Sequence, residues 1–200
     1  MSITRYEATI GSKTLSIETG RVARQADGAA FVRLGDTVVF AAVVSGPSFR
    51  NEDFFPLTVD YRERTSAAGK FPGGFIKREG RPSVKETLTA RQIDRPIRPL
   101  FADGYRDEVQ IQCIVLSADK ENDPDVLAGI AASSALAVSR IPFLSPLGFV
   151  RVGLVDGAYV CFPSYEEARK SKLCLLVVGT KDRIVMIEGG AQEASEAEVM

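Results

Sequence analysis

The sequence contains no histidine and only three cysteines in 200 residues. The lack of histidine excludes Ser-His-Asp and Cys-His nucleophile activation, zinc helices with two histidines, and the commonest general base near neutral pH. Cys113, Cys161 and Cys174 stand far apart, each in an apolar run, and so form neither a paired-cysteine metal site nor a disulfide framework. We expect three buried thiols, and any chemistry must use carboxylates, lysine, arginine, tyrosine or a bound metal.

Long apolar runs are also missing. The longest, Val38–Val44, is far shorter than the roughly 20 residues that span a bilayer, and Met1–Glu7 has no apolar signal core. An apolar content of 45% and a charged content of 26% are ordinary for a globular protein of this length. We therefore expect a single soluble, cytoplasmic domain with no membrane segment.

The formal net charge of −1 conceals a local excess of positive charge. Residues 62–106 hold eleven basic side chains against five acidic ones, so this segment carries +6 and the rest of the chain −7. A near-neutral protein that concentrates its positive charge in one stretch is suited to meeting a polyanion there. The alternative at this point is a solvated surface of mixed charge.

Alternating apolar and polar residues predict strands in much of the chain. We expect them at 5–10, 14–18, 29–34, 37–44, 57–61 and 109–116. Tight hairpins are indicated at 35–36 and 156–157, and a last hairpin turns at 179–182. The segment 65–82 has four glycines, two prolines and little apolar material, which predicts an exposed loop.

Local sequence signals also predict where helices begin. The capping box Ser83–Glu86 opens a helix expected to run to about Arg95, before Pro96. Asp123, followed by a proline, opens a second helix through about Arg140, whose small-residue face is suited to close packing on a sheet. The expected fold class is therefore α+β, with a mixed β-sheet packed against helices.

Two more capping boxes follow. Ser164 and Glu167 cap a short third helix, and Ser195–Glu198 announces another helix just before the sequence stops at Met200. A helix that short is not stable in isolation. We therefore expect residues 1–200 to form one core domain at the front of a longer polypeptide, with 191–200 starting the next helix; a frayed natural tail is the alternative.

The loop combines glycines with basic and aromatic side chains. Glycines at both ends allow a backbone to approach a ligand closely, and Lys77, Arg78 and Arg81 supply donors for phosphate. Phe75 offers a face on which an unpaired base can stack. This composition predicts a surface that binds single-stranded nucleic acid.

Three arginines on the following helix extend the predicted surface. Arg91, Arg95 and Arg98 are spaced i, i+4 and i+7, and they share one line if the chain stays helical past Pro96. The alternative is pairing with Asp94, worth only a few tenths of a kcal/mol for each exposed pair. Because one aspartate cannot neutralise three arginines, we expect an anion-binding role.

An acidic group precedes the second helix. Its members are Asp119, Glu121, Asp123 and Asp125. Carboxylates of this kind can hold a divalent ion, but Asp123 is better explained as an N-cap and a regular calcium loop is missing. We expect no metal site here.

Two longer motifs carry a resemblance to a known family. Residues 67–83 read AAGKFPGGFIKREGRPS, and residues 91–101 read RQIDRPIRPLF. Shorter matches lie at 35–37, 117–119, 179–180 and 188–191. Over essentially its whole length, the chain resembles the first ribonuclease-PH-type core domain of the bacterial polynucleotide phosphorylase family.

The resemblance implies a ribonuclease PH-like fold within a larger protein. Members of the family carry two such core domains joined by a helical domain, followed by KH and OB-type RNA-binding domains, and assemble as ring-shaped homotrimers. Single-stranded RNA threads the ring, and phosphate attacks its 3′-terminal linkage to release nucleoside diphosphates. The implied role is therefore mRNA degradation and RNA processing, with proteins of an RNA-degradation complex as further partners.

In the family a Phe-Phe-Arg-Arg loop of this domain grips RNA. The matching positions here are Phe75, Ile76, Lys77 and Arg78. The second aromatic ring is missing, and lysine keeps the charge of arginine but gives up its bidentate geometry. The resemblance thus implies RNA contacts from these positions, with one stacking partner fewer.

The resemblance implies that no catalytic residue or metal ligand lies in this chain. Competent copies of the fold have a Gly-Gly-Thr-Arg turn for phosphate, where this chain has Glu121–Asp125, whose acidic side chains would repel phosphate. They also have paired aspartates for metal on late strands, whereas 173–178 is wholly apolar. Mg²⁺ or Mn²⁺ and inorganic phosphate should bind outside these 200 residues. The alternatives are a non-catalytic RNA-binding subunit of an exosome-type ring, and a globular domain that binds no nucleic acid.

Overall fold

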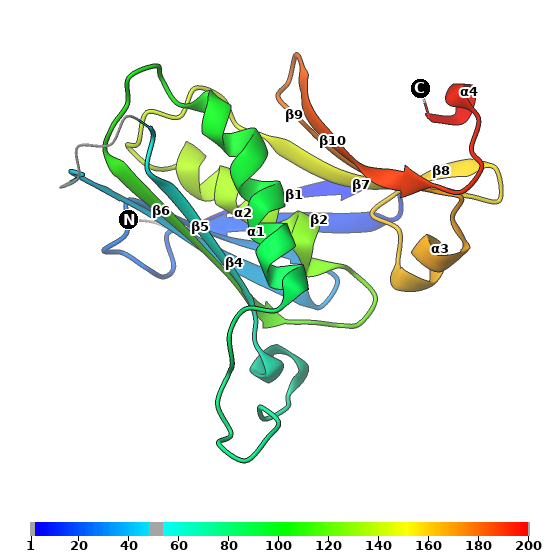
Figure 1. Ribbon diagram of the computed structural model, residues 1–200, viewed down its shortest axis with the longest axis horizontal. Helices are drawn as coiled ribbons and strands as arrows, with labels where there is room; N and C mark the ends of the chain where they lie inside the picture. Colours follow the sequence, from blue (N-terminus) through cyan, green and yellow to red (C-terminus); the bar gives the residue numbers. More distant parts are fainter. Residues whose placement is uncertain (1–2, 49–53, 200) are drawn as a thin grey trace.

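The computed structural model describes residues 3–48 and 54–199. The expectations for the two ends of the chain rest partly on Met1, Ser2 and Met200, which lie outside the described residues. Strands and helices form an α+β arrangement, as predicted, but the strands divide into two sheets (Figure 1). No helix in the described part is long and apolar enough to cross a membrane.

The larger sheet contains most of the first half of the chain. Its strands are β1 (Thr4–Ile10), β2 (Lys13–Thr19), β3 (Gly28–Leu34), β4 (Thr37–Gly46), β5 (Leu57–Glu63) and β6 (Glu108–Ser117). The strand order is β1-β2-β3-β4-β6-β5. Neighbours are antiparallel except β5, which is parallel to β6, so this sheet is mixed as expected.

The smaller sheet is antiparallel throughout. Its strands are β7 (Gly148–Val155), β8 (Ala158–Cys161), β9 (Leu173–Gly179) and β10 (Ile184–Ala191), in the order β10-β9-β7-β8. The predicted turn between β7 and β8 is confirmed, with both central residues, Asp156 and Gly157, at positive φ. This conformation suits a two-residue hairpin because its twist matches that of the strands.

In residues 3–48 and 54–199, short helical segments and four α-helices connect and cover the sheets. They are the 3₁₀ helix η1 (Thr65–Ala68), α1 (Val84–Ile97), the 3₁₀ helix η2 (Arg98–Leu100), α2 (Pro124–Ala137), α3 (Tyr165–Lys170) and α4 (Glu196–Val199). The capping boxes predicted for α1 and α3 are both present with reciprocal hydrogen bonds. At α4, the Ser195 backbone N–H and hydroxyl both donate to the Glu198 carboxylate.

Helix α1 runs further than its sequence suggests. It continues through Pro96 to Ile97 and passes directly into η2, so the predicted end at Arg95 is wrong. Proline costs a helix one backbone hydrogen bond, and here that loss falls in the last turn. The Pro96 ring is buried beside Ile93 and Ile97, and this packing offsets the loss.

Helix α2 lies between the two sheets and is buried along most of its length. Its approach is close: a Cβ atom on Gly28 of β3 would lie 2.1 Å from the Ala135 carbonyl oxygen, and one on Gly129 would lie 2.4 Å from the Phe149 ring. The predicted small-residue packing is thus confirmed, although the helix ends at Ala137. One apolar cluster contains residues of both sheets and of α2.

The three cysteines do not share one environment. Cys113 on β6 is buried and Cys174 on β9 is half-buried, but Cys161 is exposed. The expectation of three buried thiols is therefore wrong for Cys161. This residue ends β8, an edge strand with a neighbour on one side only, so an apolar run in the sequence does not bury it.

Candidate nucleic-acid interface

The predicted loop connects the end of β5 to the start of α1. It begins with η1, and residues 69–82 then project away from both sheets (Figure 1). Its base is closed by the Glu79 carboxylate, which accepts hydrogen bonds from the Thr65 backbone N–H at 3.1 Å and from the Thr65 hydroxyl at 2.9 Å. The prediction of an exposed loop is confirmed, with one 3₁₀ turn at its start.

The tip of this loop exposes both apolar and basic side chains. The Phe75 ring is fully exposed, and Ile76 retains 74% of its accessible surface. Lys77, Arg78 and Arg81 are exposed and make no hydrogen bond or ion pair with any described residue. The loop therefore holds three unbalanced cations beside an open aromatic face, which suits phosphate contacts and base stacking.

The three arginines of α1 and η2 do not all extend this surface. Arg91 is exposed and has no hydrogen bond or ion pair within residues 3–48 and 54–199. Arg95 is also exposed, but its Nη1 atom lies 3.0 Å from the Glu188 Oε2 atom on β10. An ion pair at this exposure is weak and can be exchanged for a phosphate contact. Arg91 is thus unpaired among the described residues, and Arg95 is paired with a residue of β10, a strand far from α1 in the sequence.

Arg98 differs from the other two. Its Nε and Nη2 atoms each donate to the Asp94 carboxylate at 2.7 Å, and further bonds reach the backbone carbonyls of Phe55 at 2.8 Å and Leu57 at 3.1 Å. The pairing with Asp94 that the sequence left as an alternative is therefore present. The expected line of three free guanidinium groups is wrong at Arg98, whose donors hold the start of η2 to Phe55 and to the first residue of β5.

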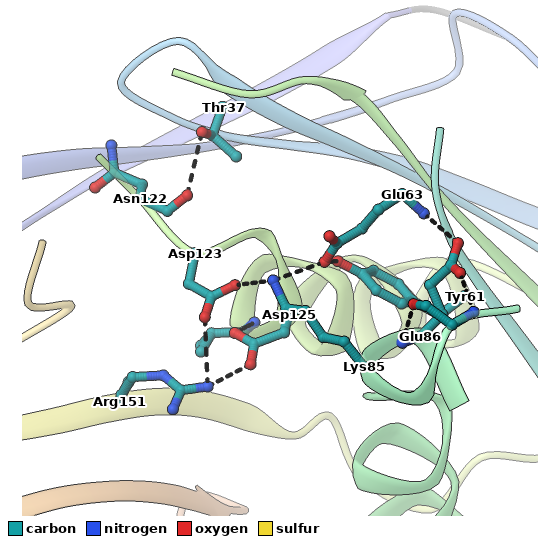
Figure 2. Close-up of polar contacts among 11 residues, drawn as sticks. Thr37, Tyr61, Glu63, Lys85, Glu86, Asn122, Asp123, Asp125 and Arg151 are labelled. Atoms are coloured by element: carbon teal, nitrogen blue, oxygen red, sulfur yellow. Dashed lines mark hydrogen bonds and ion pairs between the residues drawn. The ribbon is translucent and has the colours of Figure 1, made fainter. Parts of the chain in front are cut away.

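A network of charged side chains lies at the start of α1 and α2 (Figure 2). The Lys85 Nζ atom is 2.9 Å from the Glu63 Oε1 atom and 3.1 Å from the Asp123 Oδ1 atom. Glu63 also accepts a hydrogen bond of 2.6 Å from the Tyr61 hydroxyl. Its backbone N–H donates to Glu86 at 2.9 Å, so the capping residue of α1 also binds β5.

Arg151 extends the network to the smaller sheet. Its Nη2 atom forms an ion pair with the buried Asp125 carboxylate and lies 4.0 Å from the Asp123 Oδ2 atom. Asp123 is the N-cap residue of α2, but its side chain makes no capping hydrogen bond, contrary to the sequence interpretation. It faces Lys85 and Arg151 instead (Figure 2). The start of α2 is thus neutralised by the chain's own cations.

Local sequence patterns do not indicate this network. Lys85 contributes only to the count of basic side chains in 62–106, and Arg151 lies in a strand with no motif around it. The two meet because α2 brings Asp123 and Asp125 between α1 and β7. Contacts between elements this far apart in the chain leave no local pattern.

Burial governs the ionisation of Asp125. Burial and then the nearby Asp123 charge raise the pKa of this carboxyl, the Arg151 guanidinium opposes both, and the net pKa is about 6. Asp119 shows the reverse behaviour: despite some burial, its pKa is held well below the ordinary value by hydrogen bonds from the backbone N–H groups of Asn122 and Glu121. Asp119 is thus held in its charged form, whereas the pKa of Asp125 lies within about one pH unit of neutral pH.

We expect the free energy of unfolding to rise by about 1 kcal/mol between pH 7 and pH 5 because of Asp125. The folded state takes up this proton near pH 6, whereas the unfolded chain takes it up only near pH 4, so stability is lost as pH rises through this window. Urea unfolding at pH 7, 6 and 5 measures the effect. Asp125→Asn should remove the rise, and an equal rise in that variant would contradict the assignment.

The residues at the start of α2 do not fit a phosphate or a metal ion. The carboxylates of Asp123 and Asp125 face that end of the helix and are already engaged by Lys85 and Arg151. Within the described chain, no group of three or more histidine, cysteine, aspartate or glutamate side chains is placed to hold a metal ion. The β9 strand, 173–179, carries no carboxylate.

Family comparisons agree with the fold. The profile described as "3′ exoribonuclease family, domain 1" matches residues 11–142, and the profile for domain 2 of the same family matches residues 145–200. Two solved structures are similar: the Archaeoglobus fulgidus exosome with RNA bound to the active site (19% identity, TM-score 0.70) and an archaeal exosome core (20%, 0.65). The matched regions make up 99% and 92% of this chain, and 81% and 78% of the two exosome chains, respectively. At such identities the likeness confirms the ribonuclease PH-like fold.

Curated relatives are much more similar in sequence. Polyribonucleotide nucleotidyltransferase from Koribacter versatilis is 61% identical over 95% of this chain, and the enzyme of that name from Caulobacter vibrioides is 57% identical over 95%. The matched regions are 23% and 27% of those proteins, so the chain spans about a quarter of their length. These relatives confirm the resemblance to polynucleotide phosphorylases. The chain therefore belongs to the 3′ exoribonuclease family.

Proposed function

We propose that this chain is the RNA-binding, non-catalytic first core domain of an enzyme that degrades mRNA from its 3′ end by phosphorolysis and releases nucleoside diphosphates. The observation that carries the proposal is the exposed loop, where Lys77, Arg78 and Arg81 lack partners among the described residues and Phe75 is fully open. Planar guanidinium groups suit phosphate oxygens, and an aromatic face accepts any unpaired base.

The proposal extends to the whole protein. Its relatives are named polyribonucleotide nucleotidyltransferases, and one similar structure is an exosome with RNA bound to its active site. We propose that residues 1–200 form one core domain, which is supported by the shared apolar cluster of both sheets. The rest of the protein would supply the sites for phosphate and Mg²⁺ or Mn²⁺, and would complete a cytoplasmic homotrimer that meets other RNA-degradation proteins.

The non-catalytic assignment is supported by the charges at the start of α2. A helix of this length offers free N–H groups and a positive dipole end to an anion. Here Asp123 and Asp125 lie at that end. Lys85 and Arg151 neutralise these two carboxylates and so are not available to an incoming phosphate. No phosphate-holding turn is formed by these residues.

We expect the purified 200-residue chain to bind single-stranded RNA weakly and to release no nucleoside diphosphates when phosphate is added. The measurement is chromatography of products from a labelled oligonucleotide incubated with Mg²⁺ and phosphate. Binding without turnover supports the proposal. Phosphate-dependent release of diphosphates by this chain would show that the domain is catalytic.

We expect Arg78→Ala and Arg81→Ala each to weaken RNA binding and to reduce the slope of log affinity against log salt by about 0.7. That is the change expected when one contact to a single-strand phosphate is lost. Both side chains are exposed, so their removal should leave the free energy of unfolding nearly unchanged. Fluorescence anisotropy with a labelled oligonucleotide over a series of salt concentrations gives the slopes.

Phe75→Ala is the matched variant for this experiment. It should cost about 1 kcal/mol of binding, the lower end for one stacked base, because Ile76 supplies no second aromatic ring. Its salt slope should equal that of the unmodified chain, since no charge is removed. Unchanged slopes in the two arginine variants would mean that these side chains do not contact phosphates.

A second candidate function is a non-catalytic subunit in an exosome-type ring, which is favoured by the likeness to two exosome structures. In the first function the catalytic groups lie on the same polypeptide as this domain, whereas in the second they lie on a separate protein. If the reading frame continues beyond codon 200 into a second core domain with a Gly-Gly-Thr-Arg turn, the first function holds. A separate catalytic protein that co-purifies with this chain would favour the second.

A further inference from the structure

A pocket of about 920 Å³ lies beside the base of the loop, apart from its exposed tip. Four segments form its walls: the end of β5 with η1, the end of β6, the start of α2, and α3. Backbone hydrogen bonds join these walls, from Ala118 N–H to the Ala67 carbonyl at 3.2 Å and from Tyr165 N–H to the Glu121 carbonyl at 3.0 Å. The pocket is therefore formed by secondary structure and its immediate connections.

Three cationic side chains line this pocket without a counter-charge of their own. Arg64, Lys120 and Arg169 are exposed, and none of their side chains forms a hydrogen bond or ion pair in the described part of the chain. The hydrogen bond from Lys170 lowers the pKa of the Glu166 carboxyl, and the nearby Arg169 guanidinium adds a smaller lowering. Three cations from three separate segments thus surround one hollow.

The acidic side chains in the walls are already matched. Glu63 is paired with Lys85 at 2.9 Å, and Glu166 with Lys170 at 2.8 Å. The pocket therefore has a surplus of positive charge that its own acids do not cancel. A cleft lined by one sign of charge concentrates ligands of the opposite sign.

The wall also contains an aromatic ring. Tyr165 is 36% exposed, and it follows Ser164, which caps α3 together with Glu167. Burial and the charge of Asp123 raise the pKa of its hydroxyl to about 12, so this group is a neutral donor at physiological pH. A ring of this kind can stack on a base or donate to a polar edge of it.

We propose that this pocket binds a nucleoside phosphate, with Arg64, Lys120 and Arg169 holding the phosphate groups and Tyr165 contacting the base. The volume falls within the usual range for small-molecule sites, and cations grouped around an aromatic ring match the two halves of such a ligand. The nucleoside phosphate can be a free nucleotide or one unit of an RNA strand that passes the loop. The site is separate from Phe75 and the cations at the loop tip.

Photo-crosslinking to the complete protein tests the proposal and reports on this site alone. The probes are 8-azido-ADP and a short oligoadenylate with one 8-azidoadenosine, and mass spectrometry identifies the labelled peptides. We expect label in the peptide that contains Tyr165, displaced by unlabelled ADP or oligoadenylate respectively. Arg64→Ala, Lys120→Ala and Arg169→Ala should each raise the half-saturating concentration of the bound probe roughly tenfold, as for loss of one charge-assisted bond.

Arg24→Ala is the matched control, because this exposed arginine lies outside the pocket and should leave labelling unchanged. Labelling by ADP identifies a free-nucleotide site, and labelling by the oligonucleotide alone identifies an RNA subsite; both support the proposal. Labelling of this peptide by neither probe, or labelling that all three variants leave unchanged, overturns it. Arg78→Ala distinguishes the pocket from the loop, since it should weaken oligonucleotide binding at the loop without affecting ADP at the pocket.

Discussion

Replacing Arg151 by methionine is expected to lower the free energy of unfolding by about 3 kcal/mol at pH 7. The reason lies in Asp125, which is buried and would lose the cation that balances it. Removing one partner of a buried pair leaves an uncompensated charge, and this costs more than the pair itself contributes. Methionine keeps most of the side-chain volume, so the loss reports on charge rather than on a cavity. Urea unfolding followed by circular dichroism measures it.

The same variant should recover stability in acid. Without Arg151 the pKa of Asp125 rises further, and protonation then removes the buried charge. We expect the difference from the unmodified chain to be smaller at pH 5 than at pH 7. The double variant with Asp125→Asn should regain most of the loss, and Arg24→Met, an exposed arginine, should change little. Equal losses for Arg151→Met with and without Asp125→Asn would mean that the pair is not coupled.

This network bears on function because it occupies the end of α2. Helix N-termini attract anions, yet here Asp123 and Asp125 supply the negative charge from within the chain. Lys85 and Arg151 then join α1 and β7 to that same helix end. A position that could bind a ligand instead stabilises the contact between the two sheets.

Features set by neighbouring residues were predictable from the sequence. The capping boxes at Ser83 and Ser164 were correct, since each needs only a hydroxyl and a carboxylate three residues apart. The turn at Gly35 was correct because glycine adopts the left-handed conformation at little cost. The exposed loop followed from its four glycines, two prolines and low apolar content. All of these depend on contacts within a few residues.

Features set by distant residues were not predictable. From the sequence, Asp94 was the one acidic partner considered for the three arginines. Glu188, which pairs with Arg95, lies 93 residues away, and no local pattern indicates this contact. The predicted end of α1 before Pro96 was wrong because the burial of the Pro96 ring, which offsets the cost of proline in a helix, depends on tertiary packing. The division into two sheets likewise depends on which strands pair across α2.

Arg98 shows how these distant contacts change a predicted role. We expect Arg98→Ala to lower the free energy of unfolding by about 2 kcal/mol, because its bonds to Asp94 and to the carbonyls of Phe55 and Leu57 are lost together. The estimate allows for solvent, since the side chain is 40% exposed. Thermal or urea unfolding measures the loss. RNA affinity should fall only as far as the domain unfolds.

The salt dependence of RNA binding separates this structural role from a phosphate contact. For Arg98→Ala, measured where the protein stays folded, the slope of log affinity against log salt should match that of the unmodified chain. Arg91→Ala, on the adjoining helix α1, is the matched control: its side chain has no partner in the described chain, so stability should hold while the slope falls by about 0.7 if RNA reaches it. A reduced slope for Arg98→Ala with unchanged stability would show that its guanidinium leaves Asp94 to bind phosphate. In that case Arg91, Arg95 and Arg98 would form the continuous RNA surface that their spacing predicts.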